Sequence, residues 1–176
     1  MKKAPKGAKN SESGAKIRKS SRPKKATQPK KDRALVLGAS KLMSDAEVLF
    51  QEVISDQERR RAEDLSEASR PVLCRAVRIA ADAADIYIQA EELEIAKTVL
   101  EKCCALASGY RLGAELEATF LVSLSKVFEL IGDQAEAQAC LEEALEAAMK
   151  EKNAQLRAAL SAQVSRSLAL ILPNRR

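Results

Sequence analysis

Residues 118–151 read ATFLVSLSKVFELIGDQAEAQACLEEALEAAMKE, and this stretch decides the fold. Before its centre, apolar residues recur three and four positions apart, which is the one-sided pattern of a packed helix. Gly132 stops that helix, and Asp133 with Glu136 predicts a capping box that starts the next one. The stretch therefore predicts a helical hairpin.

The same pattern occurs a second time, earlier in the chain. Sliding the sequence against itself places Phe128 over Tyr87 and Leu141 over Leu100. A third, incomplete copy begins in residues 154–171 and then stops, as expected of a terminal capping helix. Both pairs are 41 residues apart. A constant period of about this length is typical of stacked helical hairpins. We expect helices at residues 72–90, 92–107, 113–131, 134–151 and 154–171.

The two copies also share an order of residue sizes. In residues 118–151 a large, a small and an aromatic residue precede the glycine turn, and alanine, leucine and alanine follow it. Residues 77–107 keep this order except at Glu91, which stands in place of the glycine. The residues that carry the order are Leu121, Leu124, Ser125, Phe128, Gly132, Ala137, Leu141 and Ala144 in one copy and Ala84, Tyr87, Ala96 and Leu100 in the other. Here the chain resembles the tetratricopeptide-repeat family, in its longer-repeat subclass of about 40 residues.

The resemblance implies an antiparallel helical stack whose concave face holds a peptide or a partner helix. The inner surface of such a stack comes from the first helix of each hairpin, on the side away from the second helix. The clamp with which some members hold a C-terminal carboxylate is not expected, because Asp82 and Asp85 would repel that group. The alternative is an ordinary solvated face. We expect a partner groove lined by Arg78, Asp82, Asp85, Gln89, Thr119, Val122, Ser123, Lys126 and Gln163.

Residues 34–70 form a leading helical segment before the repeat domain, which we place at residues 71–176. Ser44 and Glu47, three residues later, predict a capping box. A helix is therefore expected from that box to about Ser69.

Residues 1–33 form a tail whose charge is opposite to that of the rest of the chain. They hold thirteen Lys or Arg and two acidic residues, a net charge of +11, whereas residues 34–176 carry −6. After the initiator, Ile17 is their only large apolar residue. Such a segment cannot bury enough surface to offset the entropy lost on ordering, so we expect a disordered tail.

Lysine and arginine at this density bind polyanions by releasing condensed counterions. Nucleic acid, an anionic membrane surface and an acidic protein are candidates, and a merely solubilising tail is the alternative. The clusters are also compatible with nuclear import, so we expect an intracellular protein, cytoplasmic or nuclear. The residues expected to bind a polyanion are Lys16, Arg18, Lys19, Arg22, Lys24, Lys25, Lys30 and Lys31.

Composition excludes most chemistry and a membrane span. Hydrophobic residues make up 46% of the chain but aromatics only 3%, as in packed helices, and no apolar run approaches the ~20 residues of a membrane helix. The chain has no histidine, no Cys-x-x-Cys spacing and no glycine-rich phosphate loop. We expect a soluble, non-enzymatic protein without cofactor or metal, whose four cysteines are reduced core residues.

These features predict an adaptor or scaffold subunit of a larger assembly. Its helical repeat would bind a protein or peptide, and its tail would contact a polyanion. The alternative is a nucleic-acid-associated protein, a ribonucleoprotein or chromatin component, that acts mainly through the tail. A third hypothesis is a structural subunit that oligomerises through the leading helix around Leu49 and Phe50.

Overall fold

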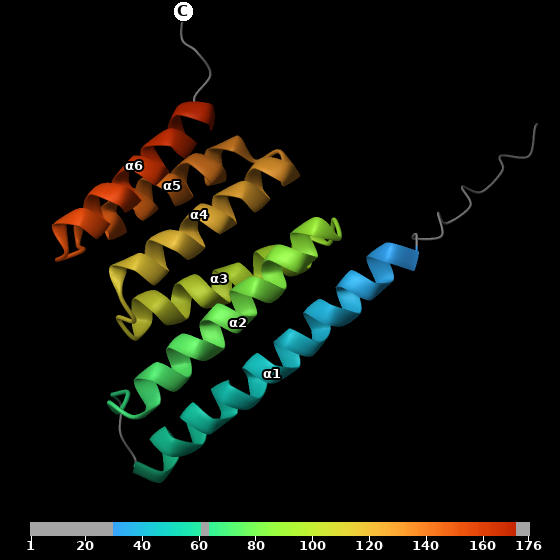
Figure 1. Ribbon diagram of the computed structural model, residues 1–176, viewed down its shortest axis with the longest axis vertical. Coiled ribbons are helices and arrows are strands. Elements are labelled where there is room, and N and C mark those ends of the chain that lie inside the picture. The colour runs from blue at the N-terminus through green and yellow to red at the C-terminus, as the bar shows by residue number, and fades with distance from the viewer. Residues whose placement is uncertain (1–29, 61–63, 172–176) are drawn as a thin grey trace, which may run out of the picture.

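The computed structural model describes residues 30–60 and 64–171, and this part of the chain consists of six α-helices without a strand. The helices are α1 (Lys30–Arg60), α2 (Ser69–Gln89), α3 (Leu93–Gly109), α4 (Ala114–Ile131), α5 (Gln134–Met149) and α6 (Ala154–Ile171). In Figure 1, α2, α4 and α6 lie in front of α3 and α5. The all-α prediction is confirmed, and the helices after α1 begin and end within three residues of the predicted positions.

The helices stack in the order of the chain. Each helix packs against the next one, and α2 also contacts α4 while α4 contacts α6. One hydrophobic cluster extends from Ala39 in α1 to Ile171 in α6, so the stack shares a core. The predicted stack of hairpins with a capping helix is therefore confirmed, with α2, α4 and α6 in one layer (Figure 1).

Small residues are buried in both hairpins. Ala84 of α2 and Ala96 of α3 are fully buried, and Ser125 of α4 and Ala137 of α5 are 1% and 0% exposed. The Ser125 hydroxyl donates a 2.9 Å hydrogen bond to the carbonyl oxygen of Val122, so its polar group is satisfied inside the core. Side chains of this size let paired helices approach closely.

Helix α1 begins earlier than the sequence predicted. It starts at Lys30, inside the predicted tail, and runs through Ser44, which is exposed in the middle of the helix. The predicted capping box of Ser44 and Glu47 is therefore wrong. The reason lies in packing: Ala39 and Ala46 are both fully buried, so the apolar stripe of α1 extends to both sides of Ser44. Tertiary burial outweighs the local capping signal.

The apolar face of α1 is used inside the domain. Phe50 is only 6% exposed, Leu49 packs against the same core, and the ammonium of Lys102 on α3 lies 5.1 Å from the centre of the Phe50 ring. Near the start of α1, the hydroxyls of Ser40 and Tyr87 are 3.2 Å apart. Phe50 therefore packs inside its own domain and Leu49 is half-buried there, while oligomerisation through the leading helix stays a hypothesis.

A small polar network joins α1 to α2. The predicted helix to Ser69 is wrong: α1 ends at Arg60, and Ser69 begins α2. The Ser66 hydroxyl oxygen accepts the backbone N–H of Ser69 at 3.0 Å, which caps α2. One carboxylate oxygen of Asp56 accepts hydrogen bonds from both serine hydroxyls, at 3.1 Å from Ser66 and 2.6 Å from Ser69. Residues distant in sequence therefore set this turn.

Three turns close in the same way, with one residue in the left-handed region. These residues are Glu91 (φ 61°), Arg111 (φ 50°) and Gly132 (φ 94°). After each of them, the next amide donates a 2.9 Å hydrogen bond to the carbonyl five residues earlier, which is a Schellman motif. The predicted cap of α5 is confirmed, since a carboxylate oxygen of Asp133 accepts the Glu136 amide at 3.2 Å. Only one of the three turns has the glycine that this conformation favours.

Replacing Glu91 by glycine is expected to stabilise the protein. Glycine removes the cost of a left-handed backbone, about 1–2 kcal/mol. Its greater conformational freedom in the unfolded state offsets part of this gain, so we expect the free energy of unfolding to rise by about 0.5–1 kcal/mol. Urea denaturation of the full chain measures it. Glu91→Ala is the control, since it removes the same charge but keeps Cβ. An equal gain in the alanine variant would assign the effect to charge.

Candidate partner-binding groove

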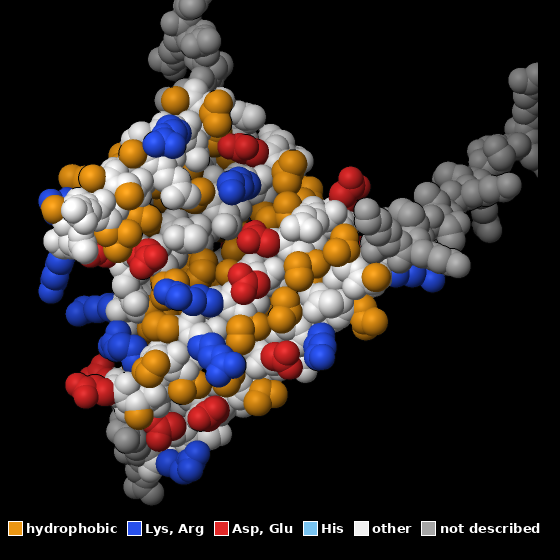
Figure 2. Space-filling model, in the orientation of Figure 1, with side chains coloured by type: hydrophobic (Ala, Val, Ile, Leu, Met, Phe, Trp, Pro, Cys, Tyr) orange, Lys and Arg blue, Asp and Glu red, His pale blue; other side chains and the backbone are white. Residues whose placement is uncertain are grey.

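The predicted groove residues meet between α2 and α4. A shallow hollow of about 310 Å³ lies between these helices, and five of the nine predicted residues line it. These are Arg78, Asp82 and Asp85 of α2 with Thr119 and Ser123 of α4. Figure 2 looks onto this layer and shows charged side chains of both signs beside apolar ones over α2 and α4.

Helical periodicity explains why these side chains share one face. Arg78, Asp82 and Asp85 are spaced four and three residues apart and are exposed, whereas the intervening Ala83 and Ala84 are buried. On α4, the Thr119 hydroxyl donates a 2.7 Å hydrogen bond to the carbonyl of Glu115, one turn earlier. The first helix of each hairpin therefore buries one side and presents the other.

Four predicted residues do not line the hollow. Val122 is 4% exposed and belongs to the core, so its assignment to the groove surface is wrong. The reason is the cap: α6 packs on α4, and Ala118, one turn before Val122, lies in a cluster with Leu160 of α6. The other three, Gln89, Lys126 and Gln163, are exposed outside the hollow.

Sequence reasoning also missed part of the lining. Ala81 of α2 and Glu115, Leu116 and Phe120 of α4 complete the hollow. Phe120 and Leu116 are mostly buried, so they form an apolar floor rather than a rim. Glu115 was detectable, because it lies four residues before Thr119 on the same helical face.

The hollow has a carboxylate-rich side whose charge is only partly balanced. Partial burial raises the pKa of Asp85 above its ordinary value, and the neighbouring carboxylate of Asp82 raises it further, while the ammonium of Lys126 opposes both effects. A partly dehydrated carboxylate beside a like charge gains from a cationic group brought by a partner. The arrangement thus favours a basic side chain near Asp82 and Asp85.

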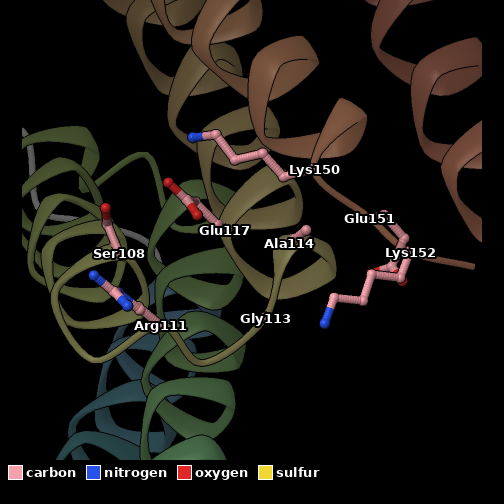
Figure 3. Close-up of a pocket in the computed structure, with 8 residues that line it drawn as sticks. All are labelled: Ser108, Arg111, Gly113, Ala114, Glu117, Lys150, Glu151 and Lys152. Carbon is pink, nitrogen blue, oxygen red and sulfur yellow. The ribbon is translucent and has the colours of Figure 1, made fainter.

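A larger hollow of about 690 Å³ lies between the turn that joins α3 to α4 and the turn that joins α5 to α6. Figure 3 shows Arg111 and Lys152 on opposite sides of it, with the Lys150 side chain extending toward Glu117. None of these residues was among those predicted from the sequence. A signal was present, since Arg111 and Lys152 are separated by one full period of the repeat.

Two segments of the chain match a known repeat. The sequence profile of the tetratricopeptide repeat matches residues 77–110 and 118–149. These two hairpins are tetratricopeptide repeats. The starts of the matched segments, residues 77 and 118, are separated by the same period that comparing the sequence with itself had found. No curated protein and no solved structure matches the chain.

Each tetratricopeptide repeat contributes its first helix to the groove, α2 from one repeat and α4 from the other. Tetratricopeptide repeats bind protein partners and are generally not enzymes. Residues 77–110 and 118–149 are therefore repeats of a kind that serves protein interaction in adaptors and scaffolds.

The predicted polyanion-binding residues fall largely outside the described structure. Residues 1–29 are not described, and of Lys30 and Lys31 only the helical backbone is. The structure therefore does not describe six of the predicted residues, which are Lys16, Arg18, Lys19, Arg22, Lys24 and Lys25. Among residues 30–60 and 64–171, no helix is long and apolar enough to cross a membrane, and no cluster of metal-ligating side chains is found.

The cysteines are free thiols at two levels of burial. Cys103 and Cys140 are buried, which agrees with the expected core role, whereas Cys74 and Cys104 are half-buried. Burial raises the pKa of Cys103 and of Cys104 to about 12 and that of Cys140 to about 11. Neutral thiols of this kind are poor nucleophiles at neutral pH.

Alkylation of the folded protein is expected to be slow at Cys103, Cys104 and Cys140. Their thiolate fraction rises about tenfold per pH unit below the pKa, so modification by iodoacetamide should accelerate steadily from pH 8 to 10. Because folding raises these pKa values, their stabilising contribution is complete below about pH 9, the ordinary value, and is lost as the pH rises toward 12. Mass spectrometry of peptides measures the rates, with urea-unfolded protein as control. Rapid modification of folded Cys103 at pH 8 would contradict this prediction.

Proposed function

We propose that this protein is an adaptor or scaffold subunit that docks a partner segment in the groove between α2 and α4 and contacts a polyanion through its basic tail. The observation that supports docking is the hollow that joins the first helices of two tetratricopeptide repeats. The segment it suits carries a basic side chain for Asp82 and Asp85 and an apolar group for the floor of Leu116 and Phe120. A location in the cytoplasm or nucleus belongs to this proposal.

The charge of the tail supports the second part of the proposal. Residues 1–33 carry +11 and residues 34–176 carry −6, so the tail presents a cationic segment beside an acidic domain. Tail and groove then serve different ligands. In the alternative function, a ribonucleoprotein or chromatin component, the tail is the main functional element and the repeats only support it.

A tail variant separates the two activities in the full chain. It replaces by glutamine the residues Lys16, Arg18, Lys19, Arg22, Lys24, Lys25, Lys30 and Lys31. Partners that bind the groove should remain after affinity purification, while binding to heparin should weaken and lose most of its dependence on salt, because fewer counterions are released.

The control for this experiment is the thermal melt, which should not change. Loss of all partners with the tail would favour the nucleic-acid-associated alternative. Undiminished heparin binding would refute the role of the tail and leave the groove proposal standing.

A further inference from the structure

One edge of the stack carries a cation at equivalent positions, at or just before the starts of α2, α4 and α6. Arg70 and Arg111 are separated by one period of the repeat, and Lys152 follows Arg111 at the same interval. They lie in the turns that lead into α2, α4 and α6, or in the first residues of those helices. We name these three residues the basic ladder. Figure 2 shows Lys and Arg side chains along the left edge, with Asp and Glu side chains at its lower end, where Figure 1 places these turns.

The first two positions of the basic ladder are in direct contact. The Arg70 guanidinium donates hydrogen bonds to the carbonyl oxygens of Tyr110 at 3.3 Å and of Arg111 at 2.9 Å. A surface hollow at this contact is lined by both ladder arginines and by Asp64. The second and third positions both line the larger hollow, and Figure 3 places them on opposite sides of it. The three cations thus border two hollows that share Arg111 as a lining residue.

Acidic neighbours do not neutralise the second and third positions. Arg111 and Lys152 form no ion pair within residues 30–60 and 64–171. The lining of the larger hollow includes three cations, Arg111, Lys150 and Lys152, and two carboxylates, Glu117 and Glu151, which gives it a net charge of +1. This edge therefore keeps positive charge although residues 34–176 together carry −6.

The spacing of the basic ladder suits a regular chain of negative charges. Because α2 contacts α4 and α4 contacts α6, successive ladder positions are on the order of one helix diameter, ~10 Å, apart. A single strand carries one phosphate per nucleotide, so a short run of nucleotides bridges such a step. A nucleic-acid strand offers a phosphate at every nucleotide and meets the ladder in any register, whereas an acidic protein would need carboxylates at one matching spacing.

We propose that the basic ladder of Arg70, Arg111 and Lys152 binds the phosphodiester backbone of single-stranded nucleic acid across the turns of the repeat. Binding is independent of base sequence, because the contacts are to phosphates and the hollows contain one aromatic residue, Tyr110. The site is distinct from both the groove and the tail. It adds a folded nucleic-acid surface to the proposed adaptor and does not depend on that function.

Salt-dependent binding of labelled 20-nucleotide oligouridine and oligothymidine to the full chain tests the proposal. In the ladder variant Arg70→Gln/Arg111→Gln/Lys152→Gln, we expect at least tenfold weaker binding at low salt. The slope of log K against log salt should fall by about 2, from three contacts at ~0.7 each. Comparison of the two oligonucleotides distinguishes RNA from DNA as the source of the backbone.

Two further variants make the result specific. Lys41→Gln/Lys102→Gln/Arg166→Gln removes the same charge from α1, α3 and the far half of α6 and should leave the slope unchanged. Arg111→Gln/Lys152→Gln spares the hydrogen bonds of Arg70, so this variant tests the ladder even if the triple variant unfolds. For this variant, the slope of log K against log salt should fall by about 1.4.

Three outcomes would overturn the proposal. One is equal binding by the ladder and control variants, and another is loss of binding in the tail variant alone, which would leave only the tail as a polyanion site. The third is displacement of the oligonucleotide by a 20-residue polyglutamate peptide at the same concentration, with the same dependence on the ladder, which would indicate an acidic protein instead. Failure of the groove to retain partners bears on the adaptor function and not on these results.

Discussion

Replacing Asp82 and Asp85 by lysine in the full chain is expected to abolish binding of the groove partner while leaving the fold intact. Both residues are exposed on α2 and line the hollow. Reversing charge on an exposed helical face changes stability by roughly a few tenths of a kcal/mol. Placing two ammonium groups opposite a basic ligand side chain costs several kcal/mol of binding energy, a loss of more than about a hundredfold in affinity.

The raised pKa of Asp85 makes this separation sharper. Partial burial and the charge of Asp82 already disfavour the ionised form of Asp85, so the folded protein loses little when this carboxylate is removed. The partner, in contrast, loses the two carboxylates that would attract its basic group. The double substitution therefore has little effect on the free energy of unfolding but a large effect on the affinity for a basic partner.

A matched charge reversal on another helix provides the control. Glu142→Lys/Glu146→Lys changes two exposed carboxylates on α5, outside the groove-forming layer. Quantified affinity purification should lose groove partners only from the Asp82/Asp85 variant, and circular dichroism melts should be similar for both. Equal retention of partners by the two variants would place the interaction surface elsewhere.

Truncating Leu141 to alanine is expected to destabilise the protein by about 2–5 kcal/mol. Leu141 lies on α5 with 0% of its surface exposed and is among the largest fully buried side chains, so truncation leaves a cavity in a shared core. Because the free energy of unfolding of a folded domain is small, a loss of this size is a large fraction of it. Urea denaturation should show the loss as a lower midpoint with an unchanged slope.

Leu130→Ala is the control for this truncation. Leu130 is near the end of α4 and is 59% exposed, so the same chemical change should alter stability by no more than about 0.5 kcal/mol. A cost below about 1 kcal/mol for Leu141→Ala would show that α5 is not part of the cooperative core.

Part of the candidate site could be predicted because it depends on one helix at a time. Arg78, Asp82 and Asp85 share a face of α2 by periodicity alone, and the hollow contains all three. Val122 could not be excluded in the same way, since its burial depends on how the other helices pack on α4. The lining by Phe120 likewise depends on how closely α4 approaches α2.

The sequence by itself determined the features that close within a few residues. The cap of α5 by Asp133, and the replacement by Glu91 of the glycine that its turn favours, both follow from local hydrogen bonding and backbone conformation. The repeat could also be recognised from local sequence, because the pattern of small and large residues within each hairpin specifies that hairpin. The period could then be found without any contact between repeats.

Only the tertiary structure decided the start of α1, the turn held by Asp56 and the meeting of the basic ladder at one edge. At the start of α1, burial of Ala39 and Ala46 outweighed a capping signal at Ser44. In the ladder, residues one period apart in the sequence become neighbours because stacked repeats bring equivalent turns together. Local propensities are worth about 1 kcal/mol or less per residue, and the apolar surface buried between helices contributes more, so the packing of the stack prevails wherever the two disagree.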